Sequence, residues 1–500
     1  MRRFLLCMML LGIGAGSYAQ SDTLTQVYSL EDFRAFALRE SKSVLISQEK
    51  IKIATELKKA AFTQFFPNFS ANGVYMWNQK NISILGEDAL LPVGTRMADG
   101  SFGFRQDQIN NQWTKVNGQP VPLDSDGKPF NPKTEPGKIM WKDYAYLPKE
   151  AMEFDVQNVF AGGIGFVQPV FMGNKIRELY KISKSNEKVA NIQHNDELQK
   201  LLLEVDEAYW RTVSLMNKQK LAARFKGLLE KLNKDVEAML TEGVATKGDL
   251  LNVRVKLNEA SLAYTRAENG VALSRMALFQ LCGLDINGNY ALRDADIEQA
   301  VITAPDGIDM ARVLDMRPEI QQLEQLGNIA KSNVNIMRSR FMPNLAVAGN
   351  YVVSNPNVFN GFSSRFSGMF NASVVLNIPI FHFGDKIHTL RAAKSQHKMV
   401  EYKIEQAKEL ITLQVRQSDF KVNEANKRLE AAISNIAAAD ENLRLANEAY
   451  KEGLISITDL MAAQTAWVSA NSDRIDAGIE VRLCELYLKR AKGENLERTN

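Results

Sequence analysis

Residues 452–460 decide the fold, and they read Glu452-Gly453-Leu454-Ile455-Ser456-Ile457-Thr458-Asp459-Leu460. A matching stretch lies 210 positions earlier, as Glu242-Gly243-Val244-Ala245-Thr246-Lys247-Gly248-Asp249-Leu250. Each stretch has a glycine, a hydroxyl residue three positions later and an aspartate six positions later. Glycine readily ends a helix, and serine, threonine and aspartate favour the start of the next one. Both stretches therefore predict the tip of a helical hairpin.

The same shift superimposes residues 204–283 on residues 414–493 without a gap. An ungapped repeat of this length predicts two similar halves rather than several unrelated domains. In the second copy, one row of bulky residues recurs every seven positions, beside a row of small ones: Val415, Val422, Leu429, Ile436, Leu443 and Tyr450, beside Ser418, Ala425, Ala432, Ala439, Ala446 and Gly453. This heptad predicts an antiparallel coiled coil. Polar Gln219, Lys226 and Asn233 in the first copy indicate a seam that is partly wet or that contacts another part of the structure.

A second internal match, shifted by 276 positions, leads from a helix into a strand in each half. Apolar residues then alternate with small or polar ones, which predicts strands at about 68–82, 153–169, 344–354 and 366–379. Such alternation fits the strands of a membrane barrel, and it also fits a half-buried sheet in a soluble protein. The N-terminal segment favours the barrel, because residues 1–19 have the basic start, apolar run and Ser17-Tyr18-Ala19 cleavage site of a signal peptide.

Prolines and glycines mark the junctions between strands and helices: Pro67, Pro169, Gly173, Pro343, Pro379 and Gly384. Proline has no N–H, so Pro169 and Pro379 are expected to end their strands. Asn174 or Asp385 is expected to cap the following helix. Long helical hairpins are then predicted at 175–283 and 386–493. The first arm has 67 residues, or roughly 100 Å of helix, far too long for a globular core.

The halves are expected to form a first structural repeat at 20–290 and a second at 291–500. Between the first two strands, residues 79–152 hold half of the chain's 14 prolines and predict a surface loop with little regular structure. Cys282 and Cys484 do not occupy equivalent repeat positions, so free buried thiols are expected.

The composition excludes several classes of function. Lys and Arg number 61 against 58 Asp and Glu, so no nucleic-acid footprint is expected. No stretch after the signal segment has 18 uninterrupted apolar residues, as a membrane-spanning helix requires. The sequence has no phosphate-binding loop, nucleophile elbow or metal-ligand spacing. We therefore expect no enzyme activity, no cofactor and no metal.

In this order, and present twice, these motifs resemble the TolC family of outer membrane efflux channels. The resemblance covers nearly the whole mature chain, including Arg317-Pro318-Glu319-Ile320. It implies a mainly α fold with a β-barrel segment. Four transmembrane strands per chain would form a twelve-stranded barrel in a homotrimer, and the duplicated hairpins would form a periplasmic tunnel. Counting agrees, because about eight strands is the smallest closed barrel. Loop 79–152 would lie outside the cell.

The resemblance also implies roles for residues at the tips. Asp459 matches one of two positions of an aspartate gate, whereas Ala462 occupies the other, which implies one acidic ring. Tyr450 matches a tyrosine that helps to hold the closed state. Ile455 replaces an arginine that pairs with the first tip in some members. The residues that match the surface that docks a periplasmic adaptor are Gly243, Val244, Thr246, Asp249, Gly453, Leu454 and Ser456. From the residues alone, Asp249 and Asp459 are equally well explained as helix-start residues.

The expected function is therefore the passive exit duct of a tripartite efflux or type I secretion system in the outer membrane of a Gram-negative bacterium. Its expected partners are a periplasmic adaptor, an inner-membrane transporter and outer membrane lipid. Two alternatives remain. A periplasmic coiled-coil adaptor has one hairpin per chain and lacks paired amphipathic strands, and a structural coiled-coil protein lacks the strands.

Overall fold

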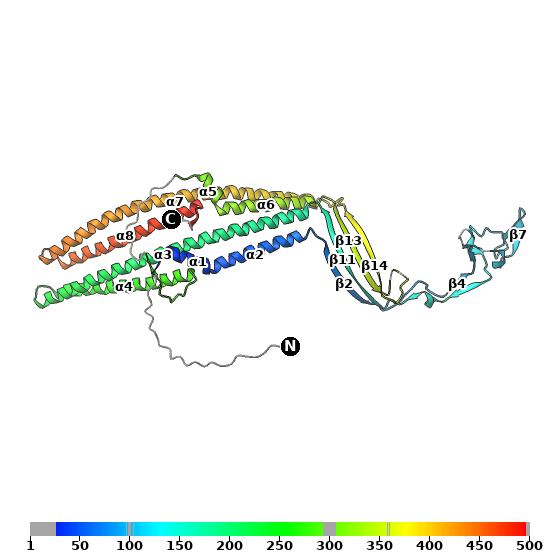
Figure 1. The fold of residues 1–500 in the computed structure, drawn as a ribbon, viewed down its shortest axis with the longest axis horizontal. Coiled ribbons are helices and arrows are strands. Elements are labelled where there is room, and N and C mark those ends of the chain that lie inside the picture. Colours follow the sequence, from blue (N-terminus) through cyan, green and yellow to red (C-terminus); the bar gives the residue numbers. More distant parts are fainter. Residues whose placement is uncertain are drawn as a thin grey trace, which may run out of the picture. The chain divides into compact units, whose positions relative to one another are not determined.

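The computed structural model describes residues 27–96, 98, 102–103, 105–293, 307–357, 359 and 361–496, so the predicted signal peptide 1–19 lies outside the described residues. The chain divides into two compact units (Figure 1). A helical unit contains Met1–Phe62, Asn174–Ser339 and His382–Asn500, and a sheet unit contains Thr63–Gly173 and Arg340–Phe381.

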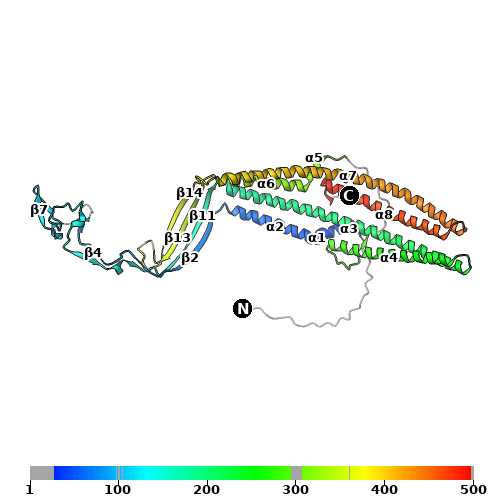
Figure 2. The same cartoon turned by 180° about the vertical axis from the view of Figure 1, so that it is seen from behind.

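Two long hairpins dominate the helical unit (Figures 1 and 2). The first consists of α3 (Lys175–Thr241) and α4 (Lys247–Leu281), and the second of α7 (Asp385–Lys451) and α8 (Ile457–Lys492). The heptad rows of the second hairpin are buried at Val415, Val422, Leu429, Val481 and Leu488, as the period predicts. The first seam is less apolar, and the Oδ1 atom of Asn233 is buried without a hydrogen-bond partner.

Shorter helices precede each strand pair: α1 (Leu30–Glu40), α2 (Lys42–Thr63), α5 (Met310–Met316) and α6 (Pro318–Ser339). A capping box formed by Ser29 and Asp32 begins α1. Ser41 has extended backbone at ψ 129° and separates α1 from α2. Arg317, which is 276 positions later, separates α5 from α6 at ψ 121°. Pro318 explains the second break, since a residue before proline avoids helical backbone, and the first half keeps the break without a proline.

The main core of the helical unit lies where α1 packs on α3 and α4. Phe33 stacks on Phe279 with ring centroids 6.2 Å apart, and Tyr209 is fully buried beside them. Within this core Arg34 donates two hydrogen bonds to the carboxylate of Asp206, at 2.7 and 2.6 Å. The nearby strands β1 (Val27–Tyr28) and β12 (Ala291–Leu292) pair in parallel. Cys282 and Cys484 are free and buried, as predicted, and burial raises the pKa of the Cys282 thiol to about 12.

The sheet unit is built on four antiparallel strands in the order β14-β13-β11-β2. They are β2 (Asn68–Trp77), β11 (Asn158–Met172), β13 (Asn344–Asn355) and β14 (Ser367–Asn377). The register aligns Phe370, Tyr351, Ile164 and Ala71 across one face. On the other face the neighbours are mostly small or polar, such as Asn371, Asn350, Gly165 and Ser70. The alternation therefore gives the sheet one apolar, aromatic face and one polar face.

Two strand boundaries differ from the predictions. The strand expected at 68–82 ends at Trp77, and the one expected at 153–169 is interrupted after Phe154 and then runs to Met172. Pro169 therefore does not end the ladder. The register shifts between Pro169 and Phe171, so an irregularity in the ladder accommodates the missing N–H. In the second half β14 ends at Asn377, ahead of Pro379.

Loop 79–152 has more regular structure than expected. Asn111 organises it, because its side chain donates to the carbonyls of Leu123 and Lys138 and accepts from the N–H of Met140. Ile109, Phe130 and Ile139 form a small core beside it. The short strands pair as β3 (Ile82–Ser83) with β10 (Glu153–Phe154), β4 (Ala89–Pro92) with β9 (Tyr144–Leu147), β5 (Thr95–Arg96) with β6 (Phe102–Gly103), and β7 (Trp113–Val116) with β8 (Gln119–Pro122). Three 3-10 helices lie between them, at Gln106–Gln108, Pro136–Lys138 and Lys149–Met152.

Breaking the buried pair should destabilise the helical unit. Arg34→Met leaves the Asp206 carboxylate buried without its cation, which costs about 3–5 kcal/mol. The midpoint of unfolding, followed by circular dichroism in detergent, should fall. Adding Asp206→Leu should recover most of the loss, and Lys59→Met, at an exposed ion pair, should change little. Equal midpoints for Arg34→Met and Lys59→Met would show that the buried pair is not needed for stability.

Candidate functional site

The two hairpin tips have the same backbone structure. Gly243 and Gly453 have φ of +76° and +74°, in the left-handed region that favours glycine. The N–H of Val244 bonds to the carbonyl of Met239 at 2.9 Å, and the N–H of Leu454 bonds to that of Ala449 at 2.8 Å. These bonds satisfy carbonyls that the helix leaves free at its end. Each glycine therefore ends its long helix and turns the chain.

The returning helices begin with matched capping boxes. At the first tip, Asp249 Oδ2 accepts from the N–H and hydroxyl of Thr246, at 3.0 and 2.7 Å. At the second, Asp459 Oδ2 accepts from the N–H and hydroxyl of Ser456, at 3.2 and 2.7 Å. Each hydroxyl oxygen in turn accepts from the aspartate N–H, at 3.1 and 3.2 Å. Both aspartates thus have a complete structural role at a helix N-terminus.

The capping bonds also affect ionisation. The hydroxyl of Thr246, and then its backbone N–H, lower the pKa of the Asp249 carboxyl. A lowered pKa means that the ionised form is favoured in the folded state. The stability that this cap contributes is therefore present above the ordinary pKa of an aspartate, and it is lost as the pH falls through the lowered value.

Apolar packing joins the two tips within the helical unit. Leu232, Val236 and Val253 of the first hairpin share one buried cluster with Ile457 and Leu460 of the second. Ile455, the residue in place of an arginine, packs against this cluster. The first tip is therefore held to the second by apolar contacts.

Tyr450 adds a polar contact between the tips. Its hydroxyl donates to the sulfur of Met239, at 3.6 Å. Burial, followed by the charges of Asp249 and Asp235, raises the pKa of Tyr450. The hydroxyl therefore keeps its proton and can donate at neutral pH. This contact links the second hairpin to the last turns of α3.

Asp459 also borders a groove on the second hairpin. The groove has a volume of about 540 Å³, and much of its wall is alanine, including Ala446, Ala449 and Ala462. Small side chains let another helix approach closely. The tip residues predicted from the sequence thus lie together in two turns. Asp459 both bonds to Ser456 and lines this groove.

The predicted junction residues have mixed outcomes. Gly173 and Gly384 adopt positive φ, at +59° and +90°. Asn174 occupies the N-cap of α3, as expected, but it has left-handed backbone and its side chain makes no capping bond. The cap expected at Asp385 is wrong, because Gly384 takes the capping position and Asp385 is the first residue of α7. A left-handed residue turns the chain into each helix without a side-chain cap.

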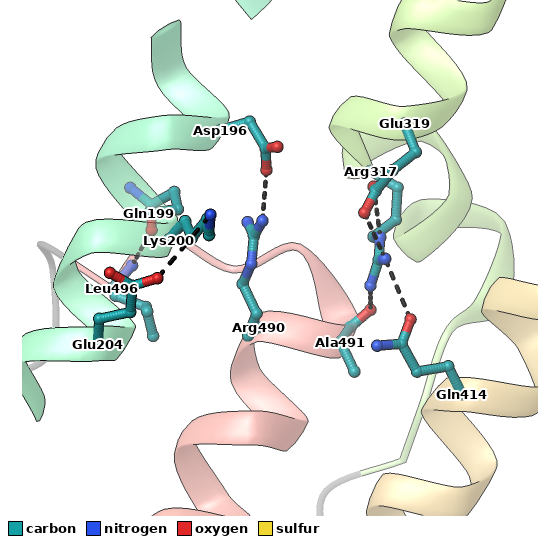
Figure 3. A network of polar contacts seen from close by, with 10 residues as sticks. All are labelled: Asp196, Gln199, Lys200, Glu204, Arg317, Glu319, Gln414, Arg490, Ala491 and Leu496. Carbon is teal, nitrogen blue, oxygen red and sulfur yellow. Dashed lines mark hydrogen bonds and ion pairs between the residues drawn. The ribbon is translucent and has the colours of Figure 1, made fainter. Parts of the chain in front are cut away.

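Sequence reasoning missed a polar network around Arg317 (Figure 3). This buried guanidinium donates to both oxygens of Glu319, at 2.9 and 2.7 Å, to the carbonyl of Ala491 at 2.8 Å and to Gln414 at 3.1 Å. It ties the start of α6 to α7 and to the end of α8. Burial acts to raise the pKa of Glu319, but the bonds from Arg317, the backbone N–H of Glu319 and the charges of Arg317 and Arg490 together lower it. The sequence Arg317-Pro318-Glu319 could have located this site, but no sequence pattern indicated Gln414 as a partner of Arg317.

A second part of the network joins the hairpins (Figure 3). Arg490 of α8 pairs with Asp196 of α3, and Gln199 accepts from the N–H of Leu496 at 2.8 Å. Among the described residues no group of three metal-binding side chains occurs, and no described helix is long and apolar enough to cross a membrane.

Comparison with known proteins agrees with this architecture. A family model described as outer membrane efflux protein matches residues 310–494. The chain is 25% identical over 252 residues to the probable efflux pump outer membrane protein TtgC of Pseudomonas putida, covering 50% of this chain and 51% of that one. It is 20% identical over 344 residues to outer membrane protein TolC of Vibrio cholerae, covering 67% and 77%. The chain thus spans about half the length of the curated relatives that it matches first.

A solved structure shares the fold. The CmeC outer membrane channel of Campylobacter jejuni has a TM-score of 0.69 at 14% identity, covering 94% of this chain and 87% of that one. The family model and the named relatives indicate an outer membrane protein with a large periplasmic part. In sequence the chain is similar to the TolC family of outer membrane efflux proteins, with the family-model match confined to residues 310–494.

The second cap can be tested directly. Ser456→Ala removes the hydroxyl that holds Asp459, and loss of an N-cap costs about 1 kcal/mol. Hydrogen exchange of the amides at 456 and 459 should become about fivefold faster. Thr458→Ala, in the same turn but outside the cap, should leave these rates unchanged. Similar exchange in both variants would mean that the capping box does not stabilise the tip.

Proposed function

We propose that the chain forms a homotrimeric outer membrane channel, the passive exit duct of a tripartite efflux or type I secretion system. One observation carries this proposal. The strands β2 and β14 lie at the two edges of the sheet, with 10 and 11 residues, and neither contains a proline or a charged residue. Edge strands of soluble proteins normally carry such residues to prevent pairing. Unprotected edges on both sides favour pairing with further copies.

Three copies of the chain would pair all of the edge strands. About eight strands is the smallest closed barrel, so four cannot close alone, whereas twelve can. The aromatic face of the sheet suits lipid, and the polar face suits a water-filled interior. These features favour a channel over a periplasmic adaptor or a structural coiled coil, because neither alternative needs an amphipathic sheet.

Exposed apolar side chains on α2 and α7 support the same assembly. On α2 the apolar side chains of Ile46, Ile53 and Leu57 are exposed in the single chain. On α7 a second row, with Met399 and Phe420, is exposed at helical spacing, and Phe420 has 75% exposure. Exposed apolar rows on a monomer mark interaction surfaces. Packing of α2 against α7 of the next copy would cover both rows.

The tips would dock the periplasmic adaptor and hold the gate. Closely spaced small residues in the groove beside Asp459 suit a helix from a partner. No motif in the chain binds a nucleotide, so an inner-membrane transporter would supply the energy. Around a threefold axis, three Asp459 carboxylates would form one acidic ring, since Ala462 supplies no second one. Loop 79–152 would face the cell exterior.

Assembly is the first test. Protein extracted in detergent should have the mass of three chains by native mass spectrometry. Ile53→Ser with Leu57→Ser should reduce the trimer fraction, because burial of each side chain is worth about 1.5–3 kcal/mol. Lys52→Ser with Lys59→Ser, on another face of the same helix, should leave it intact. A monomer that is stable in aqueous buffer without detergent would contradict the channel.

The gate is the second test, in planar bilayers. Asp459→Ala should lower cation selectivity and block by trivalent cations, because a ring of like charges attracts cations. Tyr450→Phe should raise the leak of large solutes, since it removes the contact with Met239. Asp249→Ala is a matched control, because Asp249 has the same capping bonds at the other tip. If both aspartate variants behave alike, Asp459 is only a capping residue and the gate lies elsewhere.

A further inference from the structure

A groove between α6 and α7 carries an unusual concentration of positive charge. These helices lie side by side (Figures 1 and 2). The groove has a volume of about 720 Å³. Lys331 and Arg338 line it from α6, and Lys394 and Lys398 line it from α7. The carboxylates in its lining belong to Glu324 and Glu401.

The four cations are not neutralised by neighbouring acids. Among the residues that the structure describes, neither Lys331 nor Lys394 is in an ion pair. Arg338 donates only to the amide oxygen of Asn335, at 3.4 Å, and Lys398 lies 5.5 Å from the ring of Tyr402. Elsewhere on the helical unit cations are commonly paired, as Lys58 is with Glu187 at 2.7 Å. The groove therefore has positive charge available for an anion.

The nearby acids are engaged with other groups or lie farther along the groove. Glu401 lies 3.5 Å from His397, and the buried Glu178 of α3, which contacts the α6 wall, pairs with Lys181 at 2.6 Å. Glu324 is 14 residues before Arg338 in α6, or roughly 21 Å along the helix. Glu324 is thus far from Arg338, and most of the positive charge lies toward the end of the groove that holds Arg338.

That end is the one nearest the strands along the chain. Arg338 is the residue before the last of α6, and β13 begins at Asn344. Lys394 and Lys398 lie in the first four turns of α7, which follows β14. If the strands span the outer membrane, as the proposed function requires, Arg338 is the cation nearest the periplasmic membrane surface. Lys331 and Lys394 lie roughly 12–14 Å along their helices from the ends that lead to the strands. Val334, between Lys331 and Arg338 on α6, gives the groove an apolar lining near the cations, and Ile404 lines it beyond Lys398 on α7.

We propose that this groove binds the phosphate headgroup of an anionic phospholipid from the periplasmic leaflet. Basic side chains beside a membrane attract anionic lipids. Lysine and arginine bind a phosphate by charge and hydrogen bonding. The apolar lining would contact the glycerol and the first methylene groups. A zwitterionic lipid has no net charge and would bind less well.

The test is native mass spectrometry of the intact trimer, titrated in detergent with phosphatidylglycerol or with phosphatidylcholine of the same acyl chains. The wild type should bind phosphatidylglycerol in preference. Lys394→Gln with Lys398→Gln should weaken this binding about tenfold or more, and Lys331→Gln, on the opposite wall, should weaken it less. Lys231→Gln with Lys234→Gln, on the exposed surface of α3, is the matched control and should change nothing.

Three outcomes would overturn the proposal. They are equal binding by the groove variant and the control, equal binding of both lipids by the wild type, or displacement by millimolar inorganic phosphate, which would assign the groove to free phosphate. Trimer mass and channel conductance are measured on the same variants. Both should be unchanged, so a loss of lipid binding remains separate from any failure of the channel function.

Discussion

Backbone hydrogen bonding is the constraint on which the rest of this molecule depends. In hydrocarbon each N–H and C=O must find a partner in the protein, because there is no water to supply one. The central strands β11 and β13 meet this condition inside one chain, whereas β2 and β14 each meet it on one side only. As a membrane structure, a single copy would thus be incomplete. In the helical unit, the apolar rows on α2 and α7 are likewise left exposed in a single copy.

The duplicated halves use different interactions for the same structural purpose. Both tips have the same glycine turn and capping box. Farther from the tips, the first half is anchored by the buried pair of Arg34 and Asp206, and the second by Arg317 with Glu319 and Gln414. Backbone geometry at the turns was conserved between the repeats, while the polar anchors differ. The helix break at Ser41 persists although only the second half has a proline beside it.

The sequence could predict those features that depend on local periodicity. Heptads located the hairpins, and alternation placed the aromatic side chains on one face of the sheet. Local rules failed where a distant contact decides the outcome. Pro169 stays within a strand because the partner strand accommodates a shift in register. Loop 79–152 is ordered by Asn111, whose three partners lie 12 to 29 residues away. At the tips, the spacing located Asp459 but could not separate a capping role from a gating role, because both require an aspartate at a helix start.

The hydrogen bond from Arg317 to Gln414 of α7 has a mechanical consequence. Gln414 is 37 residues from the end of α7 at Lys451, or roughly 55 Å of helix. If this hairpin tilts as one body about the contact with Arg317, it acts as a lever. A tilt of about 5° at the point of support displaces the far end by about 5 Å, close to the pitch of one helical turn. Side-chain adjustments around one guanidinium, too small to break a hairpin, are thereby amplified to the width of a small solute at the tip.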